Sequence, residues 1–291
     1  WPLYSLNLRK SFLGHYREIG HRWDNETPGP RKPLYLRGHP GMQVEADGPA
    51  LRVRQPAKAA LLFPLERVVR VISSGAVQWD CEALLTCAEA AVPVVFLHRD
   101  GSVRAYLFGK NTRSRDPHDL LYSRLRARLA RPNGMKRYDQ WRRMTTQAAV
   151  EALLRQWGTR YAERHPARLR QELALLRQRY AGPGPAELIE ARLYGLLAAF
   201  SAELLAEAGL DALRWTKLDF AFDLVGDLAN LLSWAVETPV LKVLEAHDRG
   251  KTDALYLVDE AQLVALFERY VPDLRRVGLD ALRQLRQLLE T

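Results

Sequence analysis

The chain has 291 residues, of which 47% are hydrophobic, and its formal net charge of +9 gives a pI near 9.7. This length and apolar content suffice for a buried core and for two domains, and they exclude an intrinsically disordered protein. The excess of positive charge favours a polyanionic partner such as nucleic acid. No apolar run approaches the roughly 18 residues of a membrane span, so no membrane partner is expected.

The first part of the sequence predicts a small β domain behind a short extension. Residues 1–32 are polar and end in a Pro- and Gly-rich cluster, which is typical of an extension or linker. Residues 33–110 contain short runs rich in Val, Ile and Phe that are separated by turn residues, as expected for strands. The runs are Val68–Ile72, Val92–Leu97 and Val103–Phe108, with one helical segment at Glu82–Ala90. The last two runs are expected to form a hairpin.

The sequence contains two cysteines, Cys81 and Cys87, in or next to the predicted helix of the β domain. Six residues on one helix do not place two thiols on the same face, so no local disulfide is expected. We expect both to be buried core thiols in a reducing cytoplasm. A zinc site is not predicted.

Residues 118–291 predict an all-helical C-terminal domain, so the expected class is α+β with the β domain first. Apolar residues recur at helical spacing, and Gly or Pro punctuates the segments. The expected helices are 119–130, 136–164, 166–180, 186–208 and 218–234, followed by a break at Pro239 and by helices from Val240, Asp259 and Leu279.

Positive charge is concentrated where the two predicted domains meet. Between Arg99 and Arg143 there are thirteen Lys or Arg against four Asp, a local balance of +9. We predict that this stretch binds nucleic-acid phosphates, with Tyr122, Tyr138 and Trp141 packed beside the backbone; the alternative is a solvated helix face. The predicted nucleic-acid-binding residues are Arg104, Lys110, Arg113, Arg115, Arg124, Arg128, Arg131, Lys136, Arg137, Arg142 and Arg143.

A second pattern of charge is acidic. Asp219, Asp223 and Asp227 recur at i, i+4 and i+8, so they would share one face if 218–232 is a helix. Three neighbouring carboxylates repel one another unless a cation relieves them, and Mg²⁺ or Mn²⁺ prefers such oxygen ligands. The alternative is an ordinary acidic outer face of an amphipathic helix.

The local sequence of residues 33–235 resembles that of the CRISPR-associated adaptation integrases. This is the family numbered one among the Cas proteins. The resemblance rests on the combination of several short segments, namely Pro33–Leu36, Pro64–Val68, Ile72–Gly75, Pro93–Leu97 and Leu218–Leu224. It implies a β domain followed by a helical domain, a homodimer with a small ferredoxin-like adaptation subunit, and insertion of short DNA segments into a repeat array.

The resemblance also implies a metal site for Mg²⁺ or Mn²⁺, built in the family from a Glu, a His and an Asp. Asp223 matches the Asp, and Glu190 resembles the Glu, with Glu172 as a competing placement. The predicted catalytic residues are thus Glu190 and Asp223, and Asp219 joins them as a predicted metal ligand. The family's His has no counterpart, because the chain has no His between His165 and His247.

Three functional hypotheses follow. The first is a metal-dependent DNA integrase or endonuclease of CRISPR spacer acquisition, in which a 3′-hydroxyl attacks a phosphodiester of double-stranded or branched DNA. The second is a catalytically inactive DNA-binding scaffold of the same fold within an adaptation assembly, which the missing His favours. The third is an RNA-binding or tRNA-modifying helical protein that uses the same basic stretch.

Overall fold

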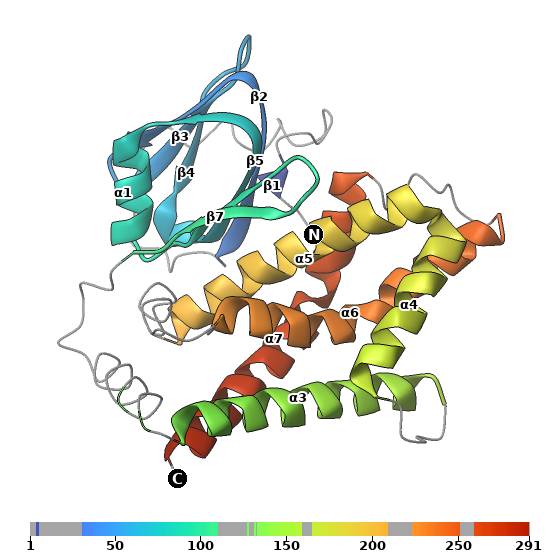
Figure 1. Cartoon of the computed structure of the whole chain (residues 1–291). Coiled ribbons are helices and arrows are strands. Elements are labelled where there is room, and N and C mark those ends of the chain that lie inside the picture. Colours follow the sequence, from blue (N-terminus) through green and yellow to red (C-terminus); the bar gives the residue numbers. More distant parts are fainter. Residues whose placement is uncertain are drawn as a thin grey trace. The chain divides into compact units, whose positions relative to one another are not determined.

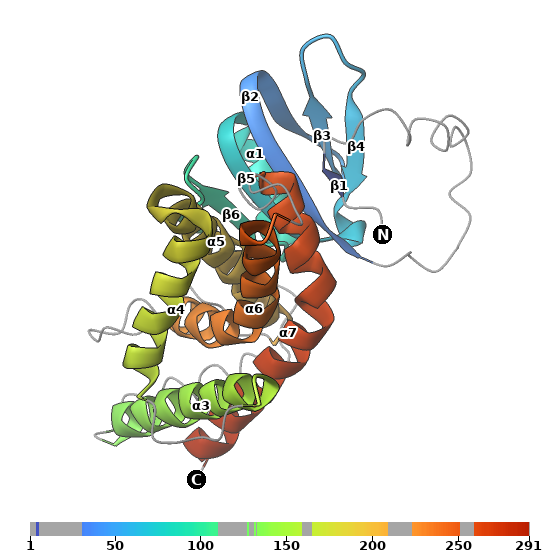
Figure 2. The same cartoon turned by 90° about the vertical axis from the view of Figure 1, so that its right-hand side faces the viewer.

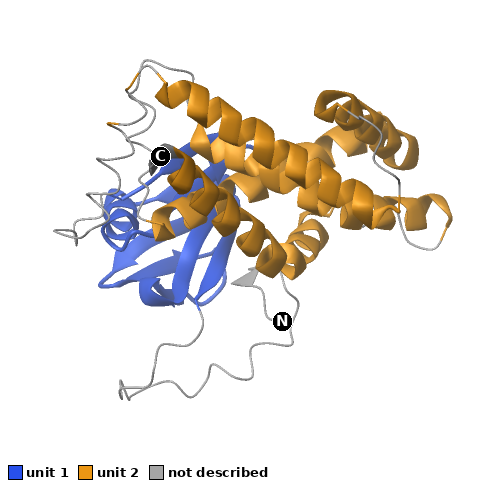
Figure 3. Cartoon of the chain, turned by 90° about the horizontal axis from the view of Figure 1, so that it is seen from below, with its two compact units in different colours: residues 1–99, 103–110 blue, residues 100–102, 111–291 orange. Residues whose placement is uncertain are grey.

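The computed structural model describes residues 4–5, 31–109, 127, 131, 133–158, 165–208, 223–250 and 259–290. The chain divides into two compact units (Figure 3). Unit 1 comprises residues 1–99 and 103–110, and unit 2 comprises residues 100–102 and 111–291. Unit 1 is built on a β-sheet and unit 2 on helices, which confirms the predicted α+β class with the β domain first.

Unit 1 contains a seven-stranded mixed sheet in the order β4-β3-β2-β5-β6-β7, with β1 paired in parallel to β2 (Figure 1). The strands are β1 (Tyr4–Ser5), β2 (Lys32–Asp47), β3 (Ala50–Arg54), β4 (Leu61–Pro64), β5 (Val68–Trp79), β6 (Val94–Leu97) and β7 (Val103–Leu107). The predicted hairpin is present as the antiparallel pair β6–β7. Pairing of Tyr4 with Leu34 places part of the predicted 1–32 extension in the sheet.

The two longest strands, β2 and β5, run in parallel and bend together at paired glycines. Gly38 lies opposite Gly75, and the register shifts between Gly38 and Met42. A side chain at Gly75 would place its Cβ 2.7 Å from the Gly38 carbonyl oxygen, and the φ of Gly75 is +74°. Glycine at both positions therefore permits a close backbone approach that a side chain would prevent.

Helix α1 (Cys81–Glu89) covers the apolar core of this unit with Ala83 and Cys87. Cys87 is fully buried, and burial raises its pKa to about 12, which keeps the thiol protonated and inert. Cys81 is exposed at the first position of α1, so the prediction that both thiols are buried is wrong for Cys81. Residues six apart on a helix lie on different faces, so only one of the two thiols can point into the core.

Unit 2 is a helical assembly formed by α3 (Gly134–Gln156), α4 (Pro166–Ala181), α5 (Pro183–Glu207), α6 (Leu224–Asp248) and α7 (Glu260–Glu290) (Figure 2). One apolar cluster joins α3, α4 and α6, with Leu153, Leu173 and Trp234 among its members. The segment Leu196–Leu205 of α5 is buried all round, as in a central helix of a bundle. No described helix of the chain is both long enough and apolar enough to cross a membrane.

Two predicted helix breaks are absent. Helix α6 continues through Pro239, and α7 is one helix through Pro272 and Gly278, where separate helices had been expected. Pro239 is buried in the bundle, so packing outweighs the hydrogen bond that proline removes from the helix. Gly278 permits close packing of α7 on α5, since a Cβ there would lie 2.5 Å from Leu204 Cδ1.

Candidate active site and nucleic-acid interface

Asp223 immediately precedes α6 and caps its N-terminus. Its φ of −127° and ψ of 82° are not helical, and its Oδ1 accepts a hydrogen bond from the Gly226 N–H at 2.8 Å. Aspartate is favoured here because it pairs an amide that the first helical turn leaves unpaired. The expectation of one helix through 218–234 is therefore wrong at Asp223, and Asp219 lies outside the described residues. A Cβ at Gly226 would lie 2.2 Å from Asp223 Oδ2, so glycine leaves room for the carboxylate.

Asp227 follows one helical turn later and connects α6 to α3. The Tyr138 hydroxyl donates to Asp227 Oδ2 at 2.6 Å, and Arg142 Nη1 lies 3.6 Å from Asp227 Oδ1. Tyr138 is 1% exposed, whereas the Arg142 side chain is 49% exposed. Tyr138 thus fixes the orientation of Asp227 from the protein interior, while Arg142 lies at the solvent edge of the same carboxylate.

Two tyrosines share the surroundings of these carboxylates. Burial, reinforced by Asp227 and Asp223, raises the pKa of Tyr138 far above its ordinary value. Burial followed by Asp223 and Asp227 also raises the pKa of Tyr194 on α5. Both hydroxyls therefore stay protonated at neutral pH and can donate hydrogen bonds toward the acidic pair.

Replacing Tyr138 by Phe is expected to reduce the alkaline sensitivity of the fold. Because the pKa is raised in the folded state, the contribution of Tyr138 is fully present below the unfolded value of about 10 and is lost as pH rises above it. In that range the free energy of unfolding should fall by about 1.4 kcal/mol per pH unit for this group. Urea denaturation between pH 8 and 11 should show the free energies of unfolding of wild type and Tyr138→Phe converging as pH rises. A constant difference between the two would contradict the raised pKa of Tyr138.

Asp223 and Asp227 lie one helical turn apart at the start of α6. Mg²⁺ is usually bound through one or two carboxylates together with waters and substrate phosphates, and Mn²⁺ accepts the same oxygen ligands. Asp223 is exposed and Asp227 is half-buried, and the Asp227 carboxylate already contacts Tyr138 and Arg142. Across the described ranges, no group of three or more His, Cys, Asp or Glu side chains lies close enough to bind one metal.

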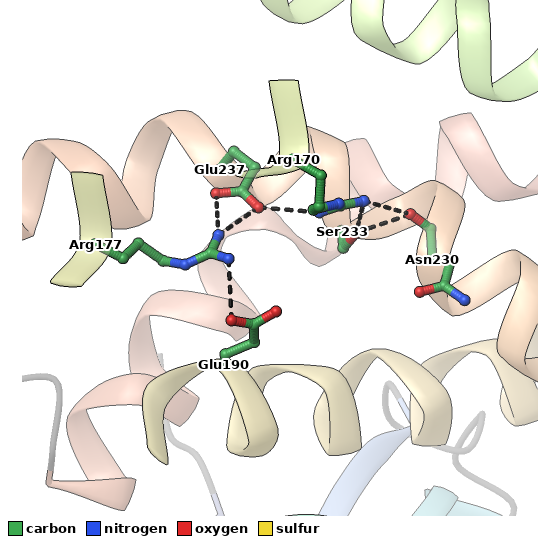
Figure 4. A network of polar contacts seen from close by, with 6 residues as sticks. All are labelled: Arg170, Arg177, Glu190, Asn230, Ser233 and Glu237. Atoms are coloured by element: carbon green, nitrogen blue, oxygen red, sulfur yellow. Dashed lines mark hydrogen bonds and ion pairs between the residues drawn. The ribbon is translucent and has the colours of Figure 1, made fainter. Parts of the chain in front are cut away.

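Glu190 belongs to a different set of contacts. It lies on α5, where its Oε2 is 3.1 Å from Arg177 Nη2 (Figure 4). The competing residue Glu172 lies on α4 and pairs with Arg168 at 3.5 Å. The structure thus places each predicted glutamate beside an arginine, and among the described residues neither belongs to a group of three or more potential metal ligands.

Most of the predicted phosphate-binding residues that the structure describes are exposed. Lys136 and Arg143 are exposed, seven residues apart on one face of α3, and Arg131 is exposed before it. Arg142 is also exposed, and it contacts Asp139 and Asp227, while Arg143 donates to the Asp139 carbonyl. Arg137 is half-buried and contacts the Leu288 carbonyl. Arg104 is exposed on β7 of unit 1. Five predicted residues lie outside the described part of the chain, namely Lys110, Arg113, Arg115, Arg124 and Arg128.

The aromatic residues of the basic stretch have structural roles that the sequence pattern did not indicate. Tyr138 and Trp141 are buried, and the Trp141 Nε1–H donates to the Ala281 carbonyl at 2.8 Å. The expectation that they pack beside a sugar-phosphate backbone is therefore wrong, whereas Tyr122 lies outside the described residues. Tyr138 and Trp141 are three residues apart, so they share one face of α3, on the side away from Lys136. This spacing could have indicated that the two aromatic side chains are buried.

Comparisons with known proteins agree with this architecture. The family model described as CRISPR associated protein Cas1 matches residues 34–180, just over half of the chain. A Cas1 protein from Thermotoga maritima is 14% identical with a TM-score of 0.68, over 89% of this chain and 97% of that one. A casposase bound to an integration product is 13% identical with a TM-score of 0.58, over 89% and 91%.

A Cas6-RT-Cas1–Cas2 complex also contains a similar structure, at 14% identity and a TM-score of 0.53, over 91% of this chain and 35% of that one. At these identities the solved structures establish a shared fold, and function has to be argued from the site. No curated protein matches the sequence. Since the family model covers half of the chain and the whole fold agrees with it, this chain belongs to the Cas1 family of CRISPR associated proteins.

Proposed function

We propose that this chain is a DNA integrase and endonuclease of CRISPR spacer acquisition that acts on double-stranded or branched DNA. Membership of the Cas1 family and the fold shared with Cas1 and casposase structures support this function. The observation that carries it is the exposed Asp223, one helical turn from Asp227 and beside the basic helix α3. This arrangement combines oxygen ligands for a cation with phosphate-binding side chains.

In this proposal a DNA 3′-hydroxyl attacks a phosphodiester near the start of α6. Asp223 and Asp227 would hold Mg²⁺ or Mn²⁺, which supplies charge stabilisation at the phosphate and at the leaving oxygen. Tyr138 holds the Asp227 carboxylate in place through its 2.6 Å hydrogen bond. Arg142, half-exposed at the edge of the site, has the planar guanidinium suited to a phosphate group.

We further propose that the chain works as a homodimer with a small ferredoxin-like adaptation subunit. This rests on family membership and on the similarity to a chain of a Cas6-RT-Cas1–Cas2 complex. Sedimentation analysis at micromolar concentration should report a dimer. A monomer alone would contradict the proposed architecture.

A second candidate function is a DNA-binding scaffold without chemistry of its own. The pairing of Glu190 with Arg177 and the lack of a His between His165 and His247 favour it. Incubation of the protein with branched and duplex DNA in Mn²⁺, Mg²⁺ or chelator separates the two. Metal-dependent products support the integrase, DNA binding without products supports the scaffold, and preferential binding of RNA contradicts both.

The exposed residues of α3 give a prediction for DNA affinity. Each phosphate contact contributes about 0.9 to the slope of log affinity against log salt, so Lys136→Gln/Arg143→Gln should lower that slope by about 1.8. Fluorescence anisotropy with duplex DNA at several salt concentrations measures it. The charge-matched control Arg168→Gln/Arg179→Gln on α4 should leave the slope unchanged. An equal decrease of the slope in both variants would indicate a non-specific effect of charge. It would contradict DNA binding at the exposed face of α3.

A further inference from the structure

An ion-pair network joins α4, α5 and α6 (Figure 4). Arg177 of α4 lies at its centre with a 5% exposed side chain. Its Nη1 donates to both carboxylate oxygens of Glu237 on α6, each at 2.7 Å, and its Nη2 donates to Glu190 Oε2 on α5 at 3.1 Å. One guanidinium therefore bridges carboxylates from two different helices.

A second arginine completes the charge balance of the network. Arg170 donates to Glu237 Oε1 at 3.1 Å and to Ser233 Oγ at 2.9 Å, and its guanidinium lies 3.8 Å from the ring centroid of Trp234. Two arginines thus face two glutamates, and no excess negative charge remains to attract a further cation. Burial lowers the pKa of Arg177, but Glu237 and Glu190 outweigh it, so its pKa is raised overall.

The contacts with Arg177 and Arg170 occupy the carboxylate of Glu237, whereas Glu190 contacts Arg177 through Oε2. A divalent cation requires about six oxygen ligands at close range, whereas both oxygens of Glu237 already accept from Arg177. The Arg177 Nε is buried in the same network and has no hydrogen-bond partner among the residues that the structure describes. A metal ion placed between Glu190 and Glu237 would have to displace a guanidinium that is buried and cannot lose its charge.

We infer that Arg177 takes the place of a divalent cation between Glu190 and Glu237, so that these carboxylates form a closed structural network. Glu190 is therefore a residue of helix packing in this chain, and any divalent cation is held without it. The inference concerns metal binding by the free protein, so a failure of the proposed DNA chemistry leaves it unaffected.

Mn²⁺ binding to the full chain, followed by electron paramagnetic resonance and by thermal unfolding, tests the inference without DNA. Glu190→Gln should change Mn²⁺ affinity by less than about twofold relative to wild type. Glu190 is 56% exposed, so this variant is expected to fold. A tenfold or greater loss of Mn²⁺ affinity in Glu190→Gln would overturn the inference.

Arg177→Met provides the complementary gain of binding, because it removes the guanidinium that Glu190 and Glu237 share and leaves Arg170 as the partner of Glu237. At Mn²⁺ about a hundredfold above the dissociation constant, its unfolding midpoint should rise by roughly 5–10 °C. Wild type and Arg177→Met/Glu190→Gln should lack this additional Mn²⁺-dependent rise. If Arg177→Met does not fold, Arg177→Gln is measured in the same way. A folded Arg177 variant that gains no Mn²⁺ site would contradict the role assigned to the guanidinium.

Discussion

Replacing Glu237 by Gln is expected to lower the free energy of unfolding of the helical unit by about 3–5 kcal/mol. Glu237 is 3% exposed and is the shared partner of Arg177 and Arg170. The amide keeps the shape of the side chain but leaves two guanidinium groups without the buried charge that balances them. Removal of one partner from a buried ion pair is costly because the remaining charge loses its buried counter-ion, and here Arg177 would keep only the exposed Glu190.

Thermal unfolding should show a decrease of roughly 6–20 °C in the midpoint for Glu237→Gln, given the usual conversion for a unit of this size. Glu172→Gln is the matched control, because Glu172 pairs with Arg168 on the surface of α4, where such pairs contribute about 0–1 kcal/mol. The double variant Arg177→Met/Glu237→Met should recover part of the loss, since it removes both charges of the central pair. Equal midpoints for Glu237→Gln and Glu172→Gln would show that the buried network contributes little.

Replacing Asp223 by Asn is expected to reduce metal-dependent DNA product formation by at least about 100-fold. A catalytic cation contributes several kcal/mol to transition-state stabilisation, and each 1.4 kcal/mol corresponds to about tenfold in rate. Asparagine removes the ligand charge but remains a good N-cap residue, so α6 should keep its stability. Loss of product without a change in the unfolding midpoint would therefore assign a chemical role to Asp223.

The control is Asp248→Asn at the other end of α6, which is the same chemical change at an exposed position. It should leave product formation unchanged within about twofold, because it lies far along the helix from the acidic pair. Product formation that is equal in Asp223→Asn and wild type would remove the start of α6 from the active site. Loss of product in both variants would indicate a general effect on DNA binding, which the anisotropy measurement detects separately.

The sequence alone determined the order of the two units and the elements whose signals are local. Short β-rich runs separated by turn residues predicted the β6–β7 hairpin, and helical periodicity predicted a helix over 166–180, where α4 lies. Combined motifs in the β domain predicted the Cas1 family. These features could be predicted because hydrophobic periodicity, turns and caps depend on residues within a few positions of one another.

Only the tertiary structure decided the partners of the charged residues and the continuity of the long helices. Arg177 meets Glu190 thirteen residues away and Glu237 sixty residues away, and Tyr138 reaches Asp227 across eighty-nine. Pro239 stays inside α6 because it is buried by the bundle, although its local signal is a break. Such outcomes depend on the packing energy of several helices at once, which no short stretch of sequence encodes.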